Sequence, residues 1–490
     1  MSKASERICD VLIEAGIDHV FGIPGGGTIP IWDALYDRTD KIKPVLCRHE
    51  QAAACMADMY GRLTGKPGVL MGQGAFIASN GSFGIIEGYL SNTPMLILTD
   101  TSDMGFSQHA NYQSGTGEYG SFDIAGIMRS MSKYTTCATT PQEVVHGVQF
   151  AIKHALAGRP GPACVVMRSK AITGEIDPER SPRIHPLAGH LPGAAPVPAQ
   201  AELEKAVQLI AGAARPVIIA GNGVHLAKAY GELLAFAECL GAPVTTSYKG
   251  KSTFPEIHPL ALGMMGTFGQ KVANKLVAEA DVLIVAGCHM GPSDTRFDNP
   301  QFIDVNRQRI IQIDIDPRNV GWTYPVALSL VGDVKWTLGE LRAKLQDKLP
   351  AAALRERQAA VAAKILQPGR PVLSVAGDGG FAMVPHVLAT AVQYAAPVVF
   401  VVMNNSILGM VHNLQSTRQR VIASEFVPMD FAAIGKAYGC RGVKVTASEQ
   451  LVQEIRKGFE ADVPTVLDVA TDRAESFLKI AIVEDLLRTS

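Results

Sequence analysis

Two short apolar runs near the carboxyl end of the chain each lead directly into a polar motif. Residues 371–376 (PVLSVA) precede Gly377-Asp378-Gly379, and residues 396–403 (APVVFVVM) precede Asn404-Asn405, which ends 27 residues after Asp378. Such runs are typical of strands buried in a parallel sheet. The carboxyl ends of parallel strands meet at one edge, where doubly wound α/β folds bind their ligands. The sequence therefore predicts an α/β fold with a ligand site at these two motifs.

The residue types in the two motifs suit a diphosphate held through a metal ion. Glycines beside Asp378 let the main chain approach phosphate oxygens at the start of the next helix. Asp378 and the side-chain oxygen of Asn405 are hard ligands suited to Mg²⁺, and a backbone carbonyl near Ile407 is a candidate third ligand. A Gly-Asp-Gly turn alone also has a simpler interpretation, because aspartate often caps a helix. The second motif, at its spacing, favours the metal site.

At these residues the chain resembles the thiamine diphosphate enzymes, whose diphosphate motif is GDG followed at this spacing by NN. The resemblance implies a glutamate in a separate domain. Arg48-His49-Glu50, followed by the alanine-rich helical run 51–63, matches the family's pattern around its catalytic acid. It implies that Glu50 shares a proton with the pyrimidine N1′, so that the cofactor's own amine can deprotonate thiazolium C2. We therefore expect Glu50 to be the catalytic residue.

The resemblance also assigns residues to the cofactor-binding surface. Residues 20–30 (VFGIPGGGTIP) match the family's first strand and glycine turn, although such a turn also occurs without a ligand. Residues 76–84 (FIASNGSFG) match the segment that packs against the thiazolium. The residues expected to contact the cofactor are Gly25, Asn80, Gly377, Gly379, Gly380, Asn404, Ile407, Leu408, Gly409 and Met410, and those expected to bind the metal are Asp378, Asn405 and Ile407.

Proline marks the boundary between the first two domains. Six prolines lie within residues 177–200, a composition typical of a linker. We expect a pyrimidine-binding domain over residues 1–176, a central domain over 201–349 and a diphosphate-binding domain over 350–490. Each is expected to be a doubly wound parallel sheet.

Short apolar strands that end in glycine or acid are also expected in the central domain, at residues 216–223, 281–287 and 310–317. Gly221-Asn222-Gly223 and Asp314-Ile315-Asp316 admit a nucleotide-binding interpretation. Glycines and acids at strand ends are, however, expected in any sheet of this class. FAD, which the resemblance allows in this domain, stays an alternative that these residues do not support.

The motif Leu408-Gly409-Met410-Val411 favours the acetolactate synthase-like branch of the family. That branch implies a transferase or lyase that decarboxylates a 2-oxo acid and passes the acyl group to an acceptor. Tyr119-Gly120 stands where the branch has its carboligation Phe-Gln step, so a simple 2-oxo acid decarboxylase remains an alternative. His109 falls near the position of a decarboxylase pocket histidine, or else lies on a surface loop.

A second departure lies before the first strand of the third domain. Only residues 350–370 separate the central domain from that strand, and the resemblance implies a longer, glycine-rich segment there that forms one wall of the cofactor site. We therefore expect the third domain to be shortened at its start. A catalytically inert protein of the same fold, acting in binding or assembly, is the second alternative.

Composition narrows the class of partner. A net charge of -1 gives no electrostatic footprint for nucleic acid or an anionic membrane. The eight cysteines lack CxxC spacing and are expected to be reduced core thiols. The sequence has neither an 18-residue apolar stretch nor a signal-peptide core at its amino terminus, so we expect a cytoplasmic protein. The resemblance implies a homodimer or homotetramer, because in that family each cofactor lies between domains of different subunits.

Overall fold

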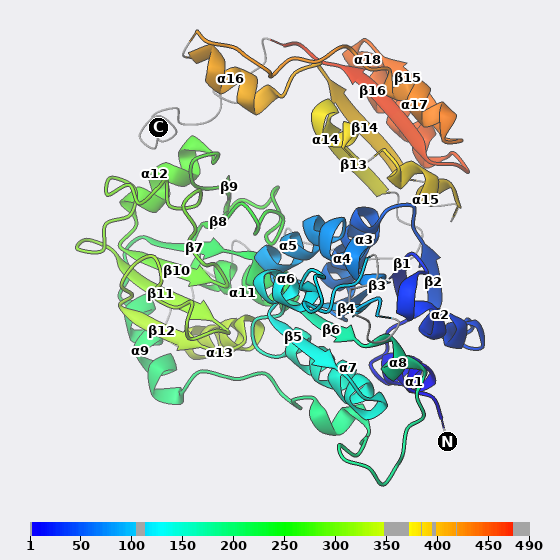
Figure 1. Ribbon diagram of the computed structural model, residues 1–490. Helices are drawn as coiled ribbons and strands as arrows, with labels where there is room; N and C mark the ends of the chain where they lie inside the picture. The colour runs from blue at the N-terminus through cyan, green and yellow to red at the C-terminus, as the bar shows by residue number, and fades with distance from the viewer. Residues whose placement is uncertain are drawn as a thin grey trace. The chain divides into compact units, whose positions relative to one another are not determined.

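The computed structural model describes residues 2–103, 113–346, 372–383, 385–393, 398–417 and 419–473, and its strands form three sheets (Figure 1). All pairings between neighbouring strands in these sheets are parallel. Helices connect the strands in each sheet, which confirms the predicted α/β class with three domains. The first and third sheets belong to one compact unit and the second sheet to another.

The first sheet has the strand order β2-β1-β3-β4-β6-β5. Its strands are β1 (His19–Gly22), β2 (Lys43–Leu46), β3 (Gly68–Gly72), β4 (Met95–Asp100), β5 (Tyr134–Ala138) and β6 (Pro162–Met167). The helices of this part are α1 (Ala4–Glu14), η1 (Gly26–Thr28), α2 (Ile29–Tyr36), α3 (Glu50–Thr64), α4 (Gly74–Ser79), α5 (Ser82–Ser91), α6 (Ile124–Met131), α7 (Pro141–Leu156), α8 (Ser169–Thr173) and η2 (Leu187–His190).

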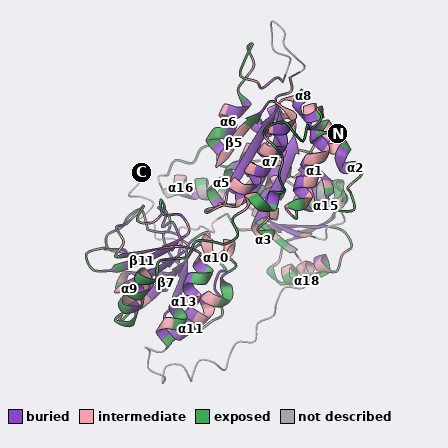
Figure 2. Cartoon of the chain, turned by 90° about the horizontal axis from the view of Figure 1, so that it is seen from below, coloured by how far each residue is buried: buried purple, intermediate pink, exposed green. Residues whose placement is uncertain are grey.

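Both faces of the first sheet are covered, as a doubly wound sheet requires. Side chains alternate between the two faces of a strand. In β4, Leu96 and Leu98 belong to one buried apolar cluster, whereas Met95 and Ile97 belong to another. The inner strands β1, β3, β4 and β6 are accordingly buried along most of their length, whereas the edge strands β2 and β5 are largely intermediate or exposed (Figure 2). Polar side chains that function must therefore lie at the strand ends.

The second sheet has the order β12-β11-β10-β7-β8-β9. Its strands are β7 (Pro216–Ala220), β8 (Val244–Thr246), β9 (Ala261–Met264), β10 (Val282–Ala286), β11 (Arg309–Asp314) and β12 (Leu328–Val331). Its helices are α9 (Gln200–Ala211), α10 (Asn222–Leu226), α11 (Tyr230–Leu240), α12 (Lys271–Glu279) and α13 (Val334–Gln346). The three strands expected at residues 216–223, 281–287 and 310–317 are therefore confirmed, each somewhat shorter than the motif.

The third sheet has four strands among the described residues, in the order β13-β14-β16-β15. The strands are β13 (Val372–Gly377), β14 (Val398–Asn404), β15 (Arg441–Val445) and β16 (Thr465–Ala470). The helices are α14 (Asp378–Ala382), α15 (Val387–Gln393), α16 (Gly409–Thr417), α17 (Phe431–Ala437) and α18 (Ser448–Phe459).

The expectation that the apolar run before Asp378 is fully buried is wrong for one face of the strand. The run does form β13, but β13 lies at the edge of the described sheet. Leu373 and Val375, which share one face, are 44% and 63% exposed. A strand rich in valine and leucine normally has both faces covered, so among the described residues one face of β13 is less covered than its sequence predicts. Residues 347–371, where the shortened start is expected, lie outside the described residues.

The proline-rich segment packs against the first domain along part of its length. Gln149 on α7 donates to the carbonyl of His185 at 2.6 Å, and the amide of Leu187 donates to Glu14 on α1 at 2.9 Å. Leu187 is itself buried in the core of the first domain. The segment expected to be a linker therefore continues the first domain as far as Leu191, whereas its last residues belong with the central domain, where the amide of Asp333 donates to the Pro196 carbonyl.

Two other expectations from composition can be compared with the structure. All eight cysteines are free, and six of them are buried; burial raises the pKa of the Cys9 thiol to about 12 and that of Cys47 to about 11. The expectation of core thiols is wrong for Cys137, which is exposed, and Cys55 is only partly buried. In the part of the chain that the structure describes, we find no helix with the length and apolar character needed to cross a membrane.

Candidate cofactor site

The two motifs near the carboxyl end meet at one edge of the third sheet. β13 and β14 pair in register, with Gly377 opposite Met403, so Asp378 directly follows β13 beside Asn404, the last residue of β14. The buried Asp378 carboxylate accepts hydrogen bonds from the main-chain amides of Asn405 at 3.0 Å and Ser406 at 2.5 Å. The same carboxylate accepts from the amide of Gly379 at 2.7 Å. The structure therefore brings the motifs together, as their spacing indicates.

The two asparagines of the second motif have different surroundings. The amide nitrogen of Asn404 donates to the Asp468 carboxylate at 2.8 Å and to the Met429 carbonyl at 3.0 Å. Asp468 also accepts from the amide of Phe431, the first residue of α17, at 3.0 Å. Asn404 thus ties β14 to β16 and to the start of α17. Its neighbour Asn405 lies in the loop that Asp378 holds, which leaves Asn405 as the better candidate for a metal ligand.

The space around the glycines along this edge shows whether a diphosphate could approach the main chain. A Cβ atom added at Gly377, Gly380 or Gly409 would meet nothing within 4 Å. These three glycines also have φ angles outside the left-handed region, so neither internal packing nor backbone conformation requires glycine there. Gly379 differs, because its added Cβ would lie 2.9 Å from Leu408. The open space beside the three glycines suits a ligand that approaches the main chain closely.

The donor set at this edge fits Mg²⁺ only if a ligand completes it. Asp378, the Asn405 amide oxygen and the Ile407 carbonyl are all oxygen donors of the hard type that Mg²⁺ prefers. Across the described residues, no three His, Cys, Asp or Glu side chains gather as a metal site. A cation here would therefore depend on one carboxylate, neutral oxygens and phosphate oxygens of the ligand. Three residues predicted to contact the cofactor lie close by in the sequence. Ile407 is buried, Leu408 is the next residue, and Met410 belongs to α16.

Glu50 and Asn80 form a second cluster, at the edge of the first sheet. Glu50 is the first residue of α3, whose cap is completed by the His49 ring accepting from the amide of Gln51 at 3.2 Å. Asn80 follows α4 and donates its amide to Glu50 Oε2 at 3.0 Å. Within the described chain, the structure gives Glu50 Oε1 no donor. This buried carboxylate therefore has one oxygen held in place and one that a ligand can use.

The glycine turn after β1 packs against residues that sequence reasoning did not single out. The amide of Gly27 donates to the Asp100 carboxylate at 2.8 Å, and a Cβ added at Gly27 would lie 2.5 Å from the Ser169 hydroxyl. Gly25, the predicted ligand residue, accepts from the Thr28 hydroxyl at 2.7 Å. The sequence feature that could have indicated Asp100 is its position as an acid at the end of a buried strand. This feature alone does not identify a functional residue, because such acids are common in this fold class.

The Glu50 and Asp378 clusters lie on different sheets, and no hydrogen bond among the described residues joins them. His109 lies outside the described residues. Tyr119 is described and has a left-handed φ of 53° in an exposed loop before α6.

The acids of the central domain are engaged within their own loop. Asp314 accepts from the amide of Asp316 at 2.9 Å and from the side chain of Asn319 at 2.5 Å. Asp316 forms two hydrogen bonds with the Arg318 guanidinium, at 3.0 and 2.9 Å. The glycines at 221 and 223 have a packing reason, since their added Cβ atoms would lie 2.3 and 2.7 Å from Gly287. These contacts give no support to FAD.

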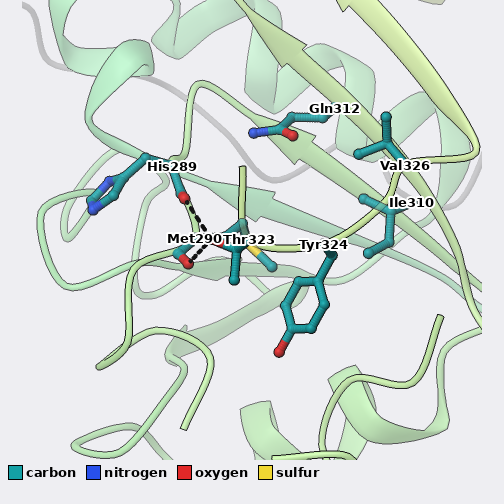
Figure 3. Close-up of a pocket in the computed structure, with 7 residues that line it drawn as sticks. All are labelled: His289, Met290, Ile310, Gln312, Thr323, Tyr324 and Val326. Atoms are coloured by element: carbon teal, nitrogen blue, oxygen red, sulfur yellow. Dashed lines mark hydrogen bonds between the residues drawn. The ribbon is translucent and has the colours of Figure 1, made fainter. Parts of the chain in front are cut away.

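A small cavity lies elsewhere in the central domain. Figure 3 shows its lining, in which the Thr323 hydroxyl donates to the Met290 carbonyl at 2.8 Å and Ile310 and Val326 supply apolar walls. The Gln312 side chain is already used, because it donates to the Cys288 carbonyl at 3.1 Å. The cavity therefore has the character of a packing gap between β11 and the neighbouring loops.

Comparisons with known proteins agree with this geometry. Three family models match, described as the N-terminal binding domain, the central domain and the C-terminal binding domain of thiamine pyrophosphate enzymes, at residues 2–119, 203–341 and 355–469. A probable acetolactate synthase large subunit of Methanocaldococcus jannaschii is 30% identical, over 97% of this chain and 93% of its own. An acetolactate synthase large subunit of Corynebacterium glutamicum is also 30% identical, over 95% and 86%. That of Haemophilus influenzae is 26% identical, over 96% and 95%.

The alignment with the Methanocaldococcus protein is longer than this chain. It runs over 565 positions, whereas this chain has 490 residues in total. The relative therefore carries segments that this chain lacks.

Proposed function

The chain belongs to the thiamine pyrophosphate enzymes, in the branch of the acetolactate synthase large subunits, and from this premise we propose that it uses thiamine diphosphate and Mg²⁺ to decarboxylate a 2-oxo acid and transfer the acyl group to an acceptor. The observation that carries the proposal is the Glu50 carboxylate, buried, held by Asn80 through one oxygen and open at the other. That is the arrangement needed by a group that shares a proton with a ligand nitrogen.

The residues have distinct tasks in this proposal. Bound thiamine diphosphate would supply the nucleophilic carbon and the electron sink for decarboxylation. Glu50 would hold a proton at Oε1 between itself and the pyrimidine, while Asn80 fixes the carboxylate. Asp378, Asn405 and the Ile407 carbonyl would hold Mg²⁺. The open space beside Gly377, Gly380 and Gly409 would admit the diphosphate.

Product analysis with 2-oxo acids tests the reaction. The purified protein with thiamine diphosphate and Mg²⁺ should consume pyruvate and form acetolactate. Release of acetaldehyde without acetolactate would instead assign the chain as a 2-oxo acid decarboxylase, the alternative favoured by Tyr119-Gly120. Turnover of neither kind with a full panel of 2-oxo acids would overturn both.

The exposed face of β13 favours a further candidate, a catalytically inert protein that keeps the fold. Leu373 and Val375 are exposed, although a strand with this apolar sequence suits burial on both faces. Calorimetric titration separates this candidate from an enzyme. We expect thiamine diphosphate to bind in the presence of Mg²⁺, and no detectable binding at high cofactor concentration would favour the inert protein.

We also propose that the working unit is a homodimer, or a tetramer built from it. On α5, Phe83, Ile86 and Leu90 lie on one helical face and are 57%, 44% and 56% exposed. The charges beside them are already paired, since Arg62 on α3 binds Glu87 at 2.8 Å. An apolar face flanked by internally satisfied charges suits a second copy of the same surface.

Charges placed on this face should separate the subunits. Phe83→Asp combined with Leu90→Asp should convert a dimer into a 52.2 kDa monomer in sedimentation at micromolar concentration, because two desolvated carboxylates would face their symmetry mates. Ile257→Asp is the matched control, since Ile257 is 98% exposed in the central domain and should leave the dimer intact. A double variant that sediments like the parent dimer would place the interface elsewhere.

A further inference from the structure

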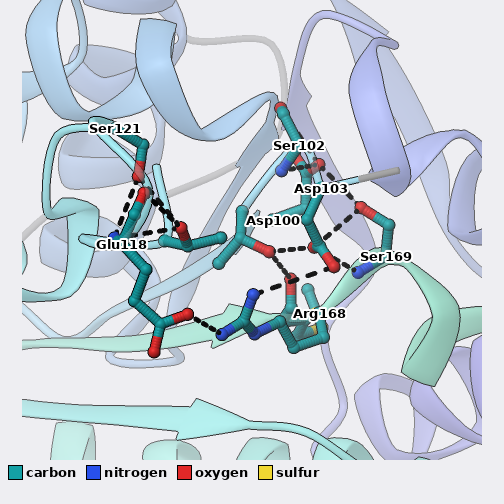
Figure 4. A network of polar contacts seen from close by, with 10 residues as sticks. Asp100, Ser102, Asp103, Glu118, Ser121, Arg168 and Ser169 are labelled. Atoms are coloured by element: carbon teal, nitrogen blue, oxygen red, sulfur yellow. Dashed lines mark hydrogen bonds and ion pairs between the residues drawn. The ribbon is translucent and has the colours of Figure 1, made fainter. Parts of the chain in front are cut away.

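Asp100 is a fully buried acid at the carboxyl end of β4. β4 lies between β3 and β6 in the first sheet, so the loops after these strands surround its end. Figure 4 shows Asp100 with Ser102, from the loop after β4, and with Ser169, which begins α8 after β6. No ion pair among the described residues neutralises Asp100. Its charge must therefore be stabilised by hydrogen-bond donors.

These donors come from four loops, which follow β1, β3, β4 and β6. Asp100 Oδ2 accepts from the main-chain amides of Gly27 and Ser102, each at 2.8 Å, and Oδ1 accepts from the amide of Gly74 at 3.2 Å. The hydroxyl of Ser169 adds a longer contact at 3.5 Å. Only an acceptor with lone pairs on both oxygens can serve donors on both sides. An asparagine would present an NH₂ group to one of them.

One of these donors connects Asp100 with Glu50. Gly74 is the first residue of α4, and a Cβ added there would lie 2.0 Å from the Asp100 carbonyl oxygen, so the start of α4 rests directly on the end of β4. α4 has six residues and ends at Ser79. The next residue, Asn80, donates to Glu50 at 3.0 Å. The short helix α4 thus contacts Asp100 at its first residue and is followed directly by Asn80, which binds Glu50.

We propose that Asp100 is a positioning residue: it seats α4 and the glycine turn so that Asn80 presents the Glu50 carboxylate in its working orientation. This inference rests on the proposed function. A proton shared between Glu50 and a ligand nitrogen needs heavy-atom distances within hydrogen-bond range. A shift of α4 of about 1 Å would be enough to lower turnover roughly 100-fold without touching the ligand.

Asp100→Asn tests the proposal, with Asp103→Asn as the matched control. Asp103 lies in the same loop, but its carboxylate contacts Thr101, Arg168 and Ser169 rather than α4 or the glycine turn. The first readout is hydrogen exchange of residues 74–80 in the cofactor-free protein. We expect faster exchange in Asp100→Asn than in the parent or the control. Unchanged exchange would refute the link to α4.

Kinetics of the loaded enzyme supply the second readout. Asp100→Asn should lower kcat roughly 10- to 100-fold with KM within about 3-fold, since orientation rather than substrate contact is lost. Combined with Asn80→Ala, it should cost no more than about 3-fold beyond the more harmful single change, because both act through one path. Fully multiplicative effects would overturn the proposal.

Two further arms keep the test decisive. If Asp100→Asn does not fold, Gly74→Ala displaces the same helix start while keeping the carboxylate, and the same two readouts apply to it. If the parent neither binds thiamine diphosphate nor turns over pyruvate, the proposed function fails. The exchange arm needs no cofactor and still decides whether Asp100 holds α4.

Discussion

Glu50→Gln should lower turnover by at least about 100-fold, the lower range of what a positioned acid–base group contributes. Glutamine keeps the volume and can still accept from Asn80, but it cannot share a proton with a ligand nitrogen. The fold and most of the affinity for thiamine diphosphate should remain, because only one buried oxygen changes. Turnover and calorimetric affinity, measured on the same preparation, check both parts.

Glu143→Gln is the matched control for this change. Glu143 also lies in the first turn of a helix of the first domain, α7, and accepts from the amides of Thr139 and Thr140 at 2.8 and 3.1 Å. It should cost about 1 kcal/mol of stability through the weakened cap and leave turnover unchanged. A Glu50→Gln enzyme with a rate near that of the parent would remove Glu50 from the chemistry.

Asp378→Asn should remove the dependence of cofactor binding on Mg²⁺. In the parent, affinity for thiamine diphosphate should be higher with Mg²⁺ than with a chelator, because the cation joins Asp378 to the diphosphate. In the variant, affinity in Mg²⁺ should fall by at least about 10-fold. Binding in the chelator should change little. Titrations of both proteins under both conditions give the comparison.

The variant will also lose stability, which the design must separate from metal binding. Asp378 accepts from the amides of Asn405 and Ser406, and weakening these bonds should cost about 1–3 kcal/mol. Asp468→Asn is the control, since Asp468 accepts from Asn404 and Phe431 in the same domain. It should lower the melting temperature but keep the Mg²⁺ dependence. A parent that binds equally well with and without Mg²⁺ would refute the metal role of Asp378.

The positions of the strand ends were predictable from the sequence. The runs before Asp378 and Asn404 form β13 and β14, and the central-domain runs form β7, β10 and β11, because a buried parallel strand needs a continuous apolar stretch. The meeting of Asp378 with Asn405 was predictable for the same reason. The two apolar runs form strands of nearly the same length that pair from their first residues, so Gly377 lies opposite Met403 and the polar residues that come next lie side by side.

The cover over each strand was not predictable from its own residues. β4 and β13 are both short and apolar, yet β4 is buried on both faces whereas Val375 on β13 is largely exposed. Burial depends on what lies against a strand, and β13 has a neighbour on one side only in the described sheet. An apolar run indicates that a strand favours burial. The elements that pack against the strand determine how much of it is actually buried.

The sequence by itself determined the fold class, the ends of the strands and the residues that gather there, because these follow from local apolar patterning and from the geometry of parallel sheets. Only the tertiary structure decided what each polar side chain does. Asn404 turns inward to Asp468 across 64 residues, whereas its neighbour Asn405 stays at the edge. Asp100 binds the amide of Gly27 across 73 residues. Such partners are chosen by which loops reach the same strand end, and sequence spacing alone does not contain that information.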